Sequence, residues 1–133
     1  MKAISAKVTR GLNIGSMLHV ADNSGARIVR ITGVKRGKTP KGRQQYAKVA
    51  DWIKVSVRAG KPEMKGKVYD AVIIRQKKPY RRKTGELVAF EDNAVAILKD
   101  DKGNPQGTQL KGPVAREVQE RWAQVAKIAQ YVL

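Results

Sequence analysis

The sequence contains no cysteine, one histidine, one phenylalanine and two tryptophans in 133 residues. The missing cysteine excludes disulfides and every zinc or iron–sulfur site built on cysteine, and it is compatible with a reducing compartment. The lone His19 has no second histidine to pair with, so we interpret it as an ordinary strand residue and not as a ligand or base. We expect no metal and no cofactor.

Long hydrophobic runs are also absent. The N-terminus lacks the continuous apolar segment of a secretory signal, and no run approaches the roughly 20 residues that span a bilayer. Glycine-rich phosphate loops, H-E-x-x-H and G-x-S-x-G are missing as well. The acids Asp22, Asp51, Asp70 and Asp92 lie at predicted turns or strand ends, where aspartate commonly bonds local backbone. We therefore expect a soluble cytoplasmic protein that is not an enzyme and has no membrane partner.

Negative charge is scarce, because 28 lysines and arginines face only 11 acids and the net charge is +17. Self-repulsion of this size disfavours the compact state unless a polyanion offsets it. Nucleic acid is the favoured polyanion, and a membrane surface is the weaker alternative. A basic surface kept only for solubility is a third reading, but ordinary surfaces intersperse both signs of charge.

The central stretch of the chain, residues 71–98, reads AVIIRQKKPYRRKTGELVAFEDNAVAIL. A β-branched run at 71–74 and apolar runs at 86–90 and 94–98 are typical of strands. Six of the nine residues from Arg75 to Lys83 are basic and none is acidic. The pattern predicts a cationic loop held between two strands, which is a suitable mount for binding.

A second basic segment, residues 35–48, has six cations, no acid, and Gly37, Pro40 and Gly42 as breakers of regular structure. It is either a disordered surface loop or a loop that becomes ordered on a phosphate backbone. We favour the second reading, because like charges this dense repel each other without a counter-charge.

Aromatic side chains are rare in both basic segments, where only Tyr46 and Tyr80 occur. Single-strand binders stack bases on aromatic rings for about 1–3 kcal/mol each, so that mode is poorly supported here. Arginine and lysine on loops favour phosphate contact and shape readout, as with structured nucleic acid. The composition does not choose RNA over DNA.

Strand patterns recur along most of the chain. Residues 16–20 and 26–34 predict a hairpin around the turn Asp22–Gly25, and an extended piece at 108–110 is expected to close the sheet. The first 13 residues are a strand, an extended arm or a frayed tail. At least five strands predict a mainly β fold with a small closed barrel, since closure removes exposed edges. The remaining predicted strands span 51–58, 67–75, 86–90 and 94–98.

The period becomes helical after Pro113, which suits the first turn of a helix. An apolar stripe at this spacing predicts one helix or two short abutting ones packed on the barrel. The near-balanced charge of this segment suits core capping or a protein partner. We expect a single domain over 1–133, with an N-terminal extension at 1–14, a barrel at 15–110 and a helical segment at 111–133. The stripe consists of Val114, Val118, Trp122, Val125, Ala129 and Val132.

Several spaced segments resemble one protein family. They are VADNSGA at 20–26, AVII at 71–74 with its basic loop, FEDNA at 90–94, GT at 107–108 and GPVARE at 112–117. In order and spacing they resemble the universal large-subunit ribosomal protein number fourteen, over about residues 11–133. The first ten residues look like an archaeal-type extension. Thr84 and Ala96 depart mildly from the family pattern, and generic basic binders have no reason to carry the 112–117 motif.

This resemblance implies a five-stranded barrel with C-terminal helices that binds large-subunit rRNA and contributes to an intersubunit bridge with small-subunit rRNA. It also implies neighbouring ribosomal proteins, and docking of the anti-association initiation factor six around 116–133. A free RNA chaperone or chromatin-type protein is the alternative, and an enzyme acting on nucleic acid is disfavoured by the absent catalytic motifs. The expected rRNA-binding residues are Arg27, Lys35, Arg36, Lys38, Lys41, Arg43, Lys48, Lys77, Lys78, Tyr80, Arg81, Arg82 and Lys83. The expected protein-contacting residues are Arg116, Glu117, Glu120, Arg121, Trp122 and Lys127.

Overall fold

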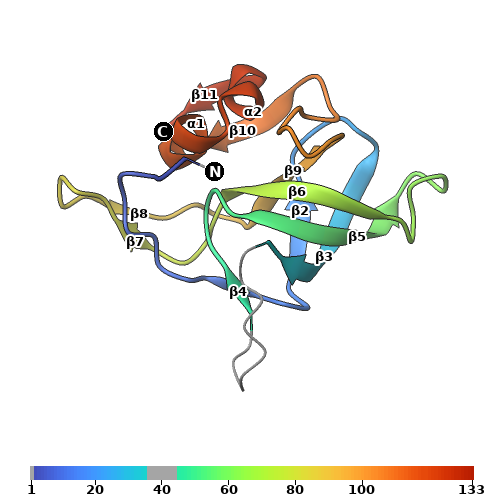
Figure 1. Cartoon of the computed structure of the whole chain (residues 1–133), viewed down its shortest axis with the longest axis horizontal. Helices are drawn as coiled ribbons and strands as arrows, with labels where there is room; N and C mark the ends of the chain where they lie inside the picture. Colours follow the sequence, from blue (N-terminus) through green and yellow to red (C-terminus); the bar gives the residue numbers. More distant parts are fainter. Residues whose placement is uncertain (1, 36–44) are drawn as a thin grey trace.

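A closed five-stranded barrel forms the body of the computed structural model, which describes residues 2–35 and 45–133 (Figure 1). Neighbouring strands follow the order β2-β3-β5-β6-β9 and are antiparallel, and a short parallel pairing between β9 and β2 closes the barrel. The predicted mainly β fold with a closed barrel is confirmed. The strand bounds are β2 Met17–Val20, β3 Ala26–Val34, β5 Trp52–Gly60, β6 Val68–Arg75 and β9 Ala94–Leu98.

Alternation along the strands places the core. In β5, Ile53, Val55 and Val57 are buried, while the residues between them face outward, as their period of two requires. All five residues of β9 are buried, as are the last five of β6. A second layer, formed by the C-terminal part of the chain, packs on β6, where the Ala115 N–H donates to the Ile74 carbonyl at 3.1 Å, and residues 105 and 106 lie against the end of β9 (Figure 1).

That layer is formed by β10 Leu110–Val114, α1 Arg116–Arg121, α2 Ala123–Lys127 and β11 Ala129–Val132. Of the two alternatives left open by the sequence, one helix or two short abutting helices, the structure shows two. The prediction that the helical segment extends from residue 114 to residue 132 was wrong at both ends. Residues 110–114 and 129–132 are strands that pair in parallel. The backbone of Trp122, at φ −126° and ψ 68°, separates the helices. Within the described ranges, no helix is long and apolar enough to cross a membrane.

A two-stranded hairpin, β7 Tyr80–Arg81 with β8 Leu87–Val88, projects from the barrel (Figure 1). The predicted strand at 86–90 was wrong in extent, because only residues 87 and 88 pair and Leu87 is 62% exposed. The prediction that 108–110 closes the sheet was also wrong, since β2 and β9 close the barrel and Leu110 begins β10.

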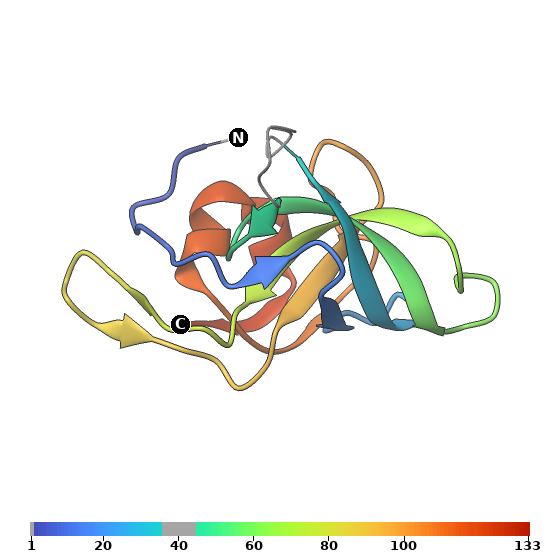
Figure 2. The same ribbon diagram turned by 90° about the horizontal axis from the view of Figure 1, so that it is seen from below.

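The N-terminal residues form an extended arm that reaches β1 Leu12–Asn13, which pairs with β4 Tyr46–Ala47 (Figure 2). Within this arm, Val8 is buried and Ile4 is partly buried against the core. The arm reading is therefore confirmed over the frayed tail.

Candidate nucleic-acid interface

The predicted RNA-binding residues fall into three structural groups. Arg36, Lys38, Lys41 and Arg43 lie outside the described residues. Tyr80 and Arg82 turn inward. The exposed group, with side chains available to a ligand, comprises Arg27, Lys77, Lys78, Arg81 and Lys83. Lys35 and Lys48 are half-buried at the two ends of the basic segment 35–48, and the Lys35 ammonium lies 4.5 Å from the centre of the Trp52 ring.

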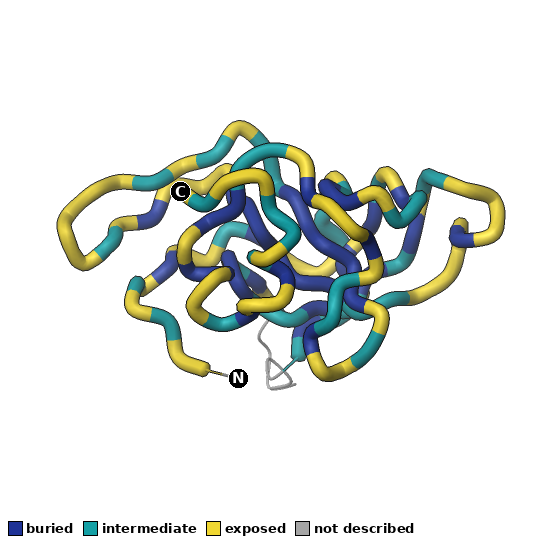
Figure 3. Tube along the Cα trace, turned by 90° about the horizontal axis from the view of Figure 1, so that it is seen from above, coloured by how far each residue is buried: buried dark blue, intermediate teal, exposed yellow. Residues whose placement is uncertain are grey.

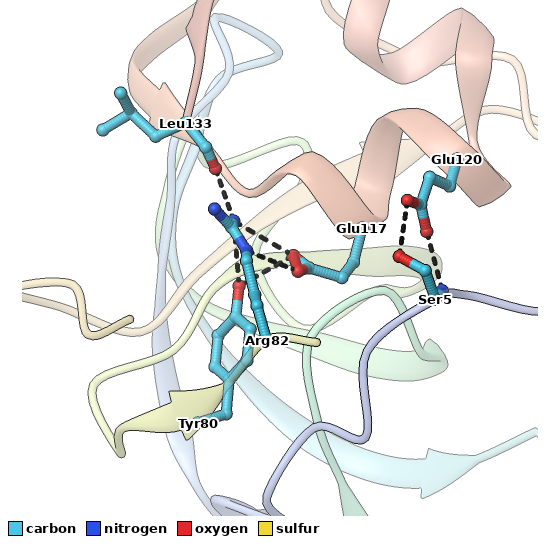
Figure 4. Close-up of polar contacts among 6 residues, drawn as sticks. All are labelled: Ser5, Tyr80, Arg82, Glu117, Glu120 and Leu133. Atoms are coloured by element: carbon cyan, nitrogen blue, oxygen red, sulfur yellow. Dashed lines mark hydrogen bonds and ion pairs between the residues drawn. The ribbon is translucent and has the colours of Figure 1, made fainter. Parts of the chain in front are cut away.

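A buried network fixes the base of the hairpin (Figure 4). The Arg82 guanidinium donates to the Glu117 carboxylate at 2.9 Å and 3.3 Å, and the Tyr80 hydroxyl donates to the same carboxylate at 2.7 Å. Glu117 is 2% exposed and Tyr80 is 1% exposed. Arg82 also donates to the carbonyl oxygen of Leu133. The hairpin is thereby joined to α1 and to the end of β11.

Charge and burial hold this network in one protonation state. Burial raises the pKa of the Tyr80 phenol, and its hydrogen bond to Glu117 adds to the rise. Burial acts to lower the pKa of Arg82, but the hydrogen bond and charge of Glu117 outweigh it and the pKa is raised. Arg82 therefore stays cationic and Tyr80 neutral. Both side chains are committed inside the chain and position the hairpin, whereas Arg81 and Lys83 carry the outward charge.

The base of the same hairpin is tied down by two further side chains. The Arg75 guanidinium pairs with Asp92 at 2.9 Å and donates to the carbonyl oxygens of Lys111 and Pro113 at 2.7 Å and 3.0 Å. Gln76 is fully buried, and its amide bonds the N–H of Val49 and the carbonyl of Thr9. The exposed cations Lys77 and Lys78 thus follow directly after two residues that cannot move freely.

A second basic surface lies at the other end of the molecule and was not predicted as a site from the sequence. Residues 58–67 carry four cations and one acid, and this local excess was the signal that could have found it. In the structure these residues form the end of β5 and the turn that leads to β6, opposite the hairpin along the long axis (Figures 1 and 3). The exposed cations are Arg58, Lys61, Lys65 and Lys67.

Local bonds make this turn compact. Met64 is buried at its centre, the Lys61 N–H donates to the Gly25 carbonyl at 3.0 Å, and the Gly66 N–H donates to the Val57 carbonyl at 2.9 Å. Gly60 has φ +146° and passes so close to the backbone of Gly25 that a Cβ would lie 2.7 Å from its oxygen. Arg27 lies on β3 beside this turn, since its neighbour Ala26 pairs with Gly60. The structure therefore groups Arg27 with the turn and away from the hairpin.

The predicted protein-contacting residues also divide. Arg116, Glu120 and Lys127 are exposed, whereas Glu117 and Trp122 are buried. The Trp122 indole N–H donates to the Ala50 carbonyl at 2.8 Å, and its ring meets Trp52 edge to face at 5.9 Å. Arg121 is partly buried and donates to backbone oxygens of the arm and of Ala50. Only the exposed three can meet a partner directly in this conformation.

The acids serve the fold. Asp22 accepts from the Ile97 N–H at 2.9 Å and from Ser24, Asp51 accepts from the Lys48 N–H at 3.0 Å, and Asp92 pairs with Arg75. Burial raises the pKa of Asp51. Over residues 2–35 and 45–133, no three histidines or acids are grouped as metal ligands would be. His19 is an exposed strand residue in β2, as its isolation in the sequence indicated.

Comparison with known proteins assigns the chain. The family model described as "Ribosomal protein L14p/L23e" matches residues 11–133. The large ribosomal subunit protein uL14 of Nanoarchaeum equitans is 52% identical over the whole of both chains, and those of Methanothrix thermoacetophila and Halobacterium salinarum are each 47% identical, also over full length. The resemblance found in the spaced sequence motifs is confirmed. With its barrel, its basic hairpin and these matches, the chain belongs to the ribosomal protein L14p/L23e family.

Proposed function

We propose that this protein is a structural constituent of the large ribosomal subunit that binds large-subunit rRNA and contributes to a bridge with small-subunit rRNA. The chain is a ribosomal protein and not an enzyme, and its place is the ribosome in the cytoplasm. The observation that carries the RNA proposal is the arrangement of exposed cations at two opposite ends of a rigid barrel (Figure 3).

The hairpin end is the proposed contact with large-subunit rRNA. Arg81 and Lys83 extend from a base that is locked by buried bonds, and Lys77 and Lys78 follow the fixed Gln76. Cations held this way contact phosphates without losing as much conformational freedom as mobile side chains would. The segment 35–48 leaves the barrel between β3 and β4, and we assign its cations to the same RNA, together with Lys35 and Lys48 at its ends.

The turn end is the proposed contact with small-subunit rRNA. The turn between β5 and β6, which carries the exposed Lys61, Lys65 and Lys67, lies opposite the hairpin along the long axis (Figure 1). One duplex docked on the hairpin therefore leaves these lysines free. Among the described residues, no acid lies within ion-pair distance of these three lysines. A compact cationic turn whose backbone is already bonded suits phosphate contact across a subunit interface.

The C-terminal layer is the proposed surface for neighbouring ribosomal proteins and for the anti-association initiation factor six. A groove of about 700 Å³ runs between residues 89–92 and β11, with half-exposed Tyr131 and Leu133 at its rim. Exposed Arg116 and Lys127 flank the same layer. Aromatic side chains and arginine are enriched at protein-contacting surfaces, as with Tyr131 and Arg116 here.

Sedimentation tests membership of the subunit. The protein from lysate is expected to migrate with the large subunit on sucrose gradients at both low and high salt. An assembled constituent resists salt because its RNA contacts are buried and numerous, whereas a general polyanion binder dissociates as salt screens it. Migration as free protein, or release at modest salt, would support the free nucleic-acid-binding alternative instead. A known core protein of the subunit, followed in the same fractions, is the control.

A further inference from the structure

The N-terminal arm, residues 2–10, is held by α1 at its start (Figure 4). The Ser5 N–H and hydroxyl donate to the two carboxylate oxygens of Glu120 at 2.9 Å and 2.8 Å. The Arg121 guanidinium donates to the Lys2 carbonyl at 2.6 Å. We call the paired bonds between Ser5 and Glu120 the clasp. It fixes a segment that has only Val8 fully buried and would otherwise fray.

The arm then crosses the base of the hairpin. Lys7 forms an antiparallel bridge with Arg81, and the Gln76 amide donates to the Thr9 carbonyl at 2.8 Å. Lys78 reaches the Arg10 carbonyl at 3.4 Å. At Gly11 a Cβ would lie 2.9 Å from Gln76, so the close approach of arm and loop depends on glycine there.

The far end of the arm reaches the other basic segment. The Arg10 guanidinium lies 3.9 Å from the centre of the Tyr46 ring, a cation–π contact, and the following β1 pairs with β4. The arm thus runs from the hairpin to the strand that ends the segment 35–48. Within the described residues, it links the hairpin to residues 46–47 at the end of the second basic segment (Figure 2).

We propose that the arm is itself part of the RNA-binding surface, with Lys7 and Arg10 contacting phosphates between the two basic regions and Ser5 and Glu120 acting as positioning residues. The proposal rests on the RNA-binding function above and extends it to a segment outside the family match, which begins at residue 11. Both cations are exposed, and no described acid lies within ion-pair distance of either. Their charge is available to RNA.

Salt dependence of binding measures these contacts. The full chain carrying Lys7→Ala and Arg10→Ala is compared with wild type on large-subunit rRNA of the same organism. Two lost phosphate contacts reduce the magnitude of the negative slope of log affinity against log salt by about 1.4–1.8. The matched control, Lys99→Ala with Lys102→Ala, removes the same charge from the exposed loop after β9 and keeps the wild-type slope. A slope unchanged in the arm variant overturns the proposal.

A directed probe separates this proposal from the function on which it rests. Because the chain has no cysteine, Thr9→Cys on the arm and Glu86→Cys on the hairpin each accept a single tethered iron chelate that cleaves nearby RNA. Both positions are exposed. In large subunits, we expect the two probes to cut overlapping parts of large-subunit rRNA. Cleavage from position 86 without cleavage from position 9 overturns the arm proposal alone, and silence from both overturns the RNA-binding function as well.

The clasp has its own readout. In a Glu120→Ala background the arm loses both bonds to Ser5, so cleavage from position 9 should weaken several-fold and spread over more nucleotides. Cleavage from position 86 should stay as it was, because the hairpin is held by Glu117. In Glu120→Gln, which keeps one acceptor oxygen, cleavage from position 9 should be intermediate between wild type and Glu120→Ala. If cleavage from position 9 in the Glu120→Ala background stays as strong and as confined as in wild type, Ser5 and Glu120 do not position the arm.

Discussion

The two basic ends of this molecule, the β7–β8 hairpin and the turn at 58–67, present similar charge but are stabilised by different contacts. The hairpin end is held by long-range bonds, in which Arg82 and Tyr80 meet Glu117 some 35 residues away in the chain. The turn end is held by backbone bonds within 57–67, by the buried Met64 and by the bond from the Lys61 N–H to the Gly25 carbonyl on the neighbouring side of the barrel. The first depends on the C-terminal layer and the second does not. The comparison implies that the two ends can be damaged independently.

Glu117→Ala is expected to have the largest effect. It leaves the Arg82 charge and the Tyr80 hydroxyl buried without their partner, a loss worth about 3–5 kcal/mol of unfolding free energy. Chemical denaturation measures it. The hairpin end should also lose RNA affinity, while the turn end keeps its contacts.

Trp122→Ala is the control for Glu117→Ala, because its expected loss of stability is similar. Its ring is 8% exposed and packs on Trp52, so truncation should cost about 3–5 kcal/mol by leaving a cavity. It touches neither basic end, and binding to rRNA under conditions where the variant is folded should keep the wild-type salt slope. If Glu117→Ala weakens rRNA binding at the hairpin no more than Trp122→Ala does, the bonds of Glu117 to Arg82 and Tyr80 have no special role in holding the hairpin.

Met64→Ala tests the local construction. Truncating this buried side chain should cost about 2 kcal/mol, the low end for a core methionine, because a surface turn can partly collapse around it. Hydrogen exchange should rise at the amides of Gly66 and Lys67, whose acceptors lie within the same turn or at its base. Faster exchange at the hairpin amides as well would contradict the independence of the two ends.

Arginine substitutions in the hairpin should separate charge that binds from charge that supports. Arg81→Ala with Lys83→Ala should reduce the magnitude of the salt slope of rRNA binding by about 1.4–1.8, with little change in stability. Arg82→Ala should lower the stability of the fold and leave the salt slope unchanged, because the Arg82 guanidinium is bonded inside the chain. Equal effects of Arg81→Ala and Arg82→Ala on the slope would show that Arg82 reaches phosphate in the complex.

The smallest expected effect concerns pH. The Ser5 backbone N–H, bonded to the carboxylate, lowers the pKa of Glu120 below its ordinary value. A lowered folded pKa means that Glu120 stabilises the arm above its unfolded pKa, about 4.3, and that this stability is lost as pH falls through the folded pKa. Hydrogen exchange at the Ser5 amide should therefore lose protection in acid. Glu120→Gln should remove this pH dependence, and a Ser5 amide equally protected at all pH values in wild type would contradict it.

The barrel was predictable because its strands carry their pattern locally. Ile53, Val55 and Val57 alternate, and residues 94–98 form a continuous β-branched and apolar run. The C-terminal layer was predicted only in part, because spacings of three and four residues also fit Val114 and Val132, which are in strands. Pairing between β10 and β11 overrides the helical period there.

The sequence predicted where the positive charge lies, but it did not predict which of the basic residues face outward and which support the fold. Counting cations found the hairpin, but nothing near Arg82 or Tyr80 in the sequence indicates that Glu117 turns both inward. The same is true of the arm, whose acceptor Glu120 lies 115 residues from Ser5. Contacts at such separations are decided by the assembled fold and leave no local trace. The basic surface at 58–67 differs, because its signal, four cations and one acid within ten residues, is local and could have been recognised in the sequence.

The assignment of the two ends to different RNAs is tested most directly by tethered cleavage from single cysteines at Glu86 on the hairpin and Glu63 on the turn, both exposed. The measurement compares isolated large subunits with joined ribosomes. The account predicts that the probe at position 86 cuts large-subunit rRNA in both, and that the probe at position 63 cuts small-subunit rRNA in joined ribosomes only. Cleavage of large-subunit rRNA alone from position 63, with the same pattern before and after joining, would contradict it.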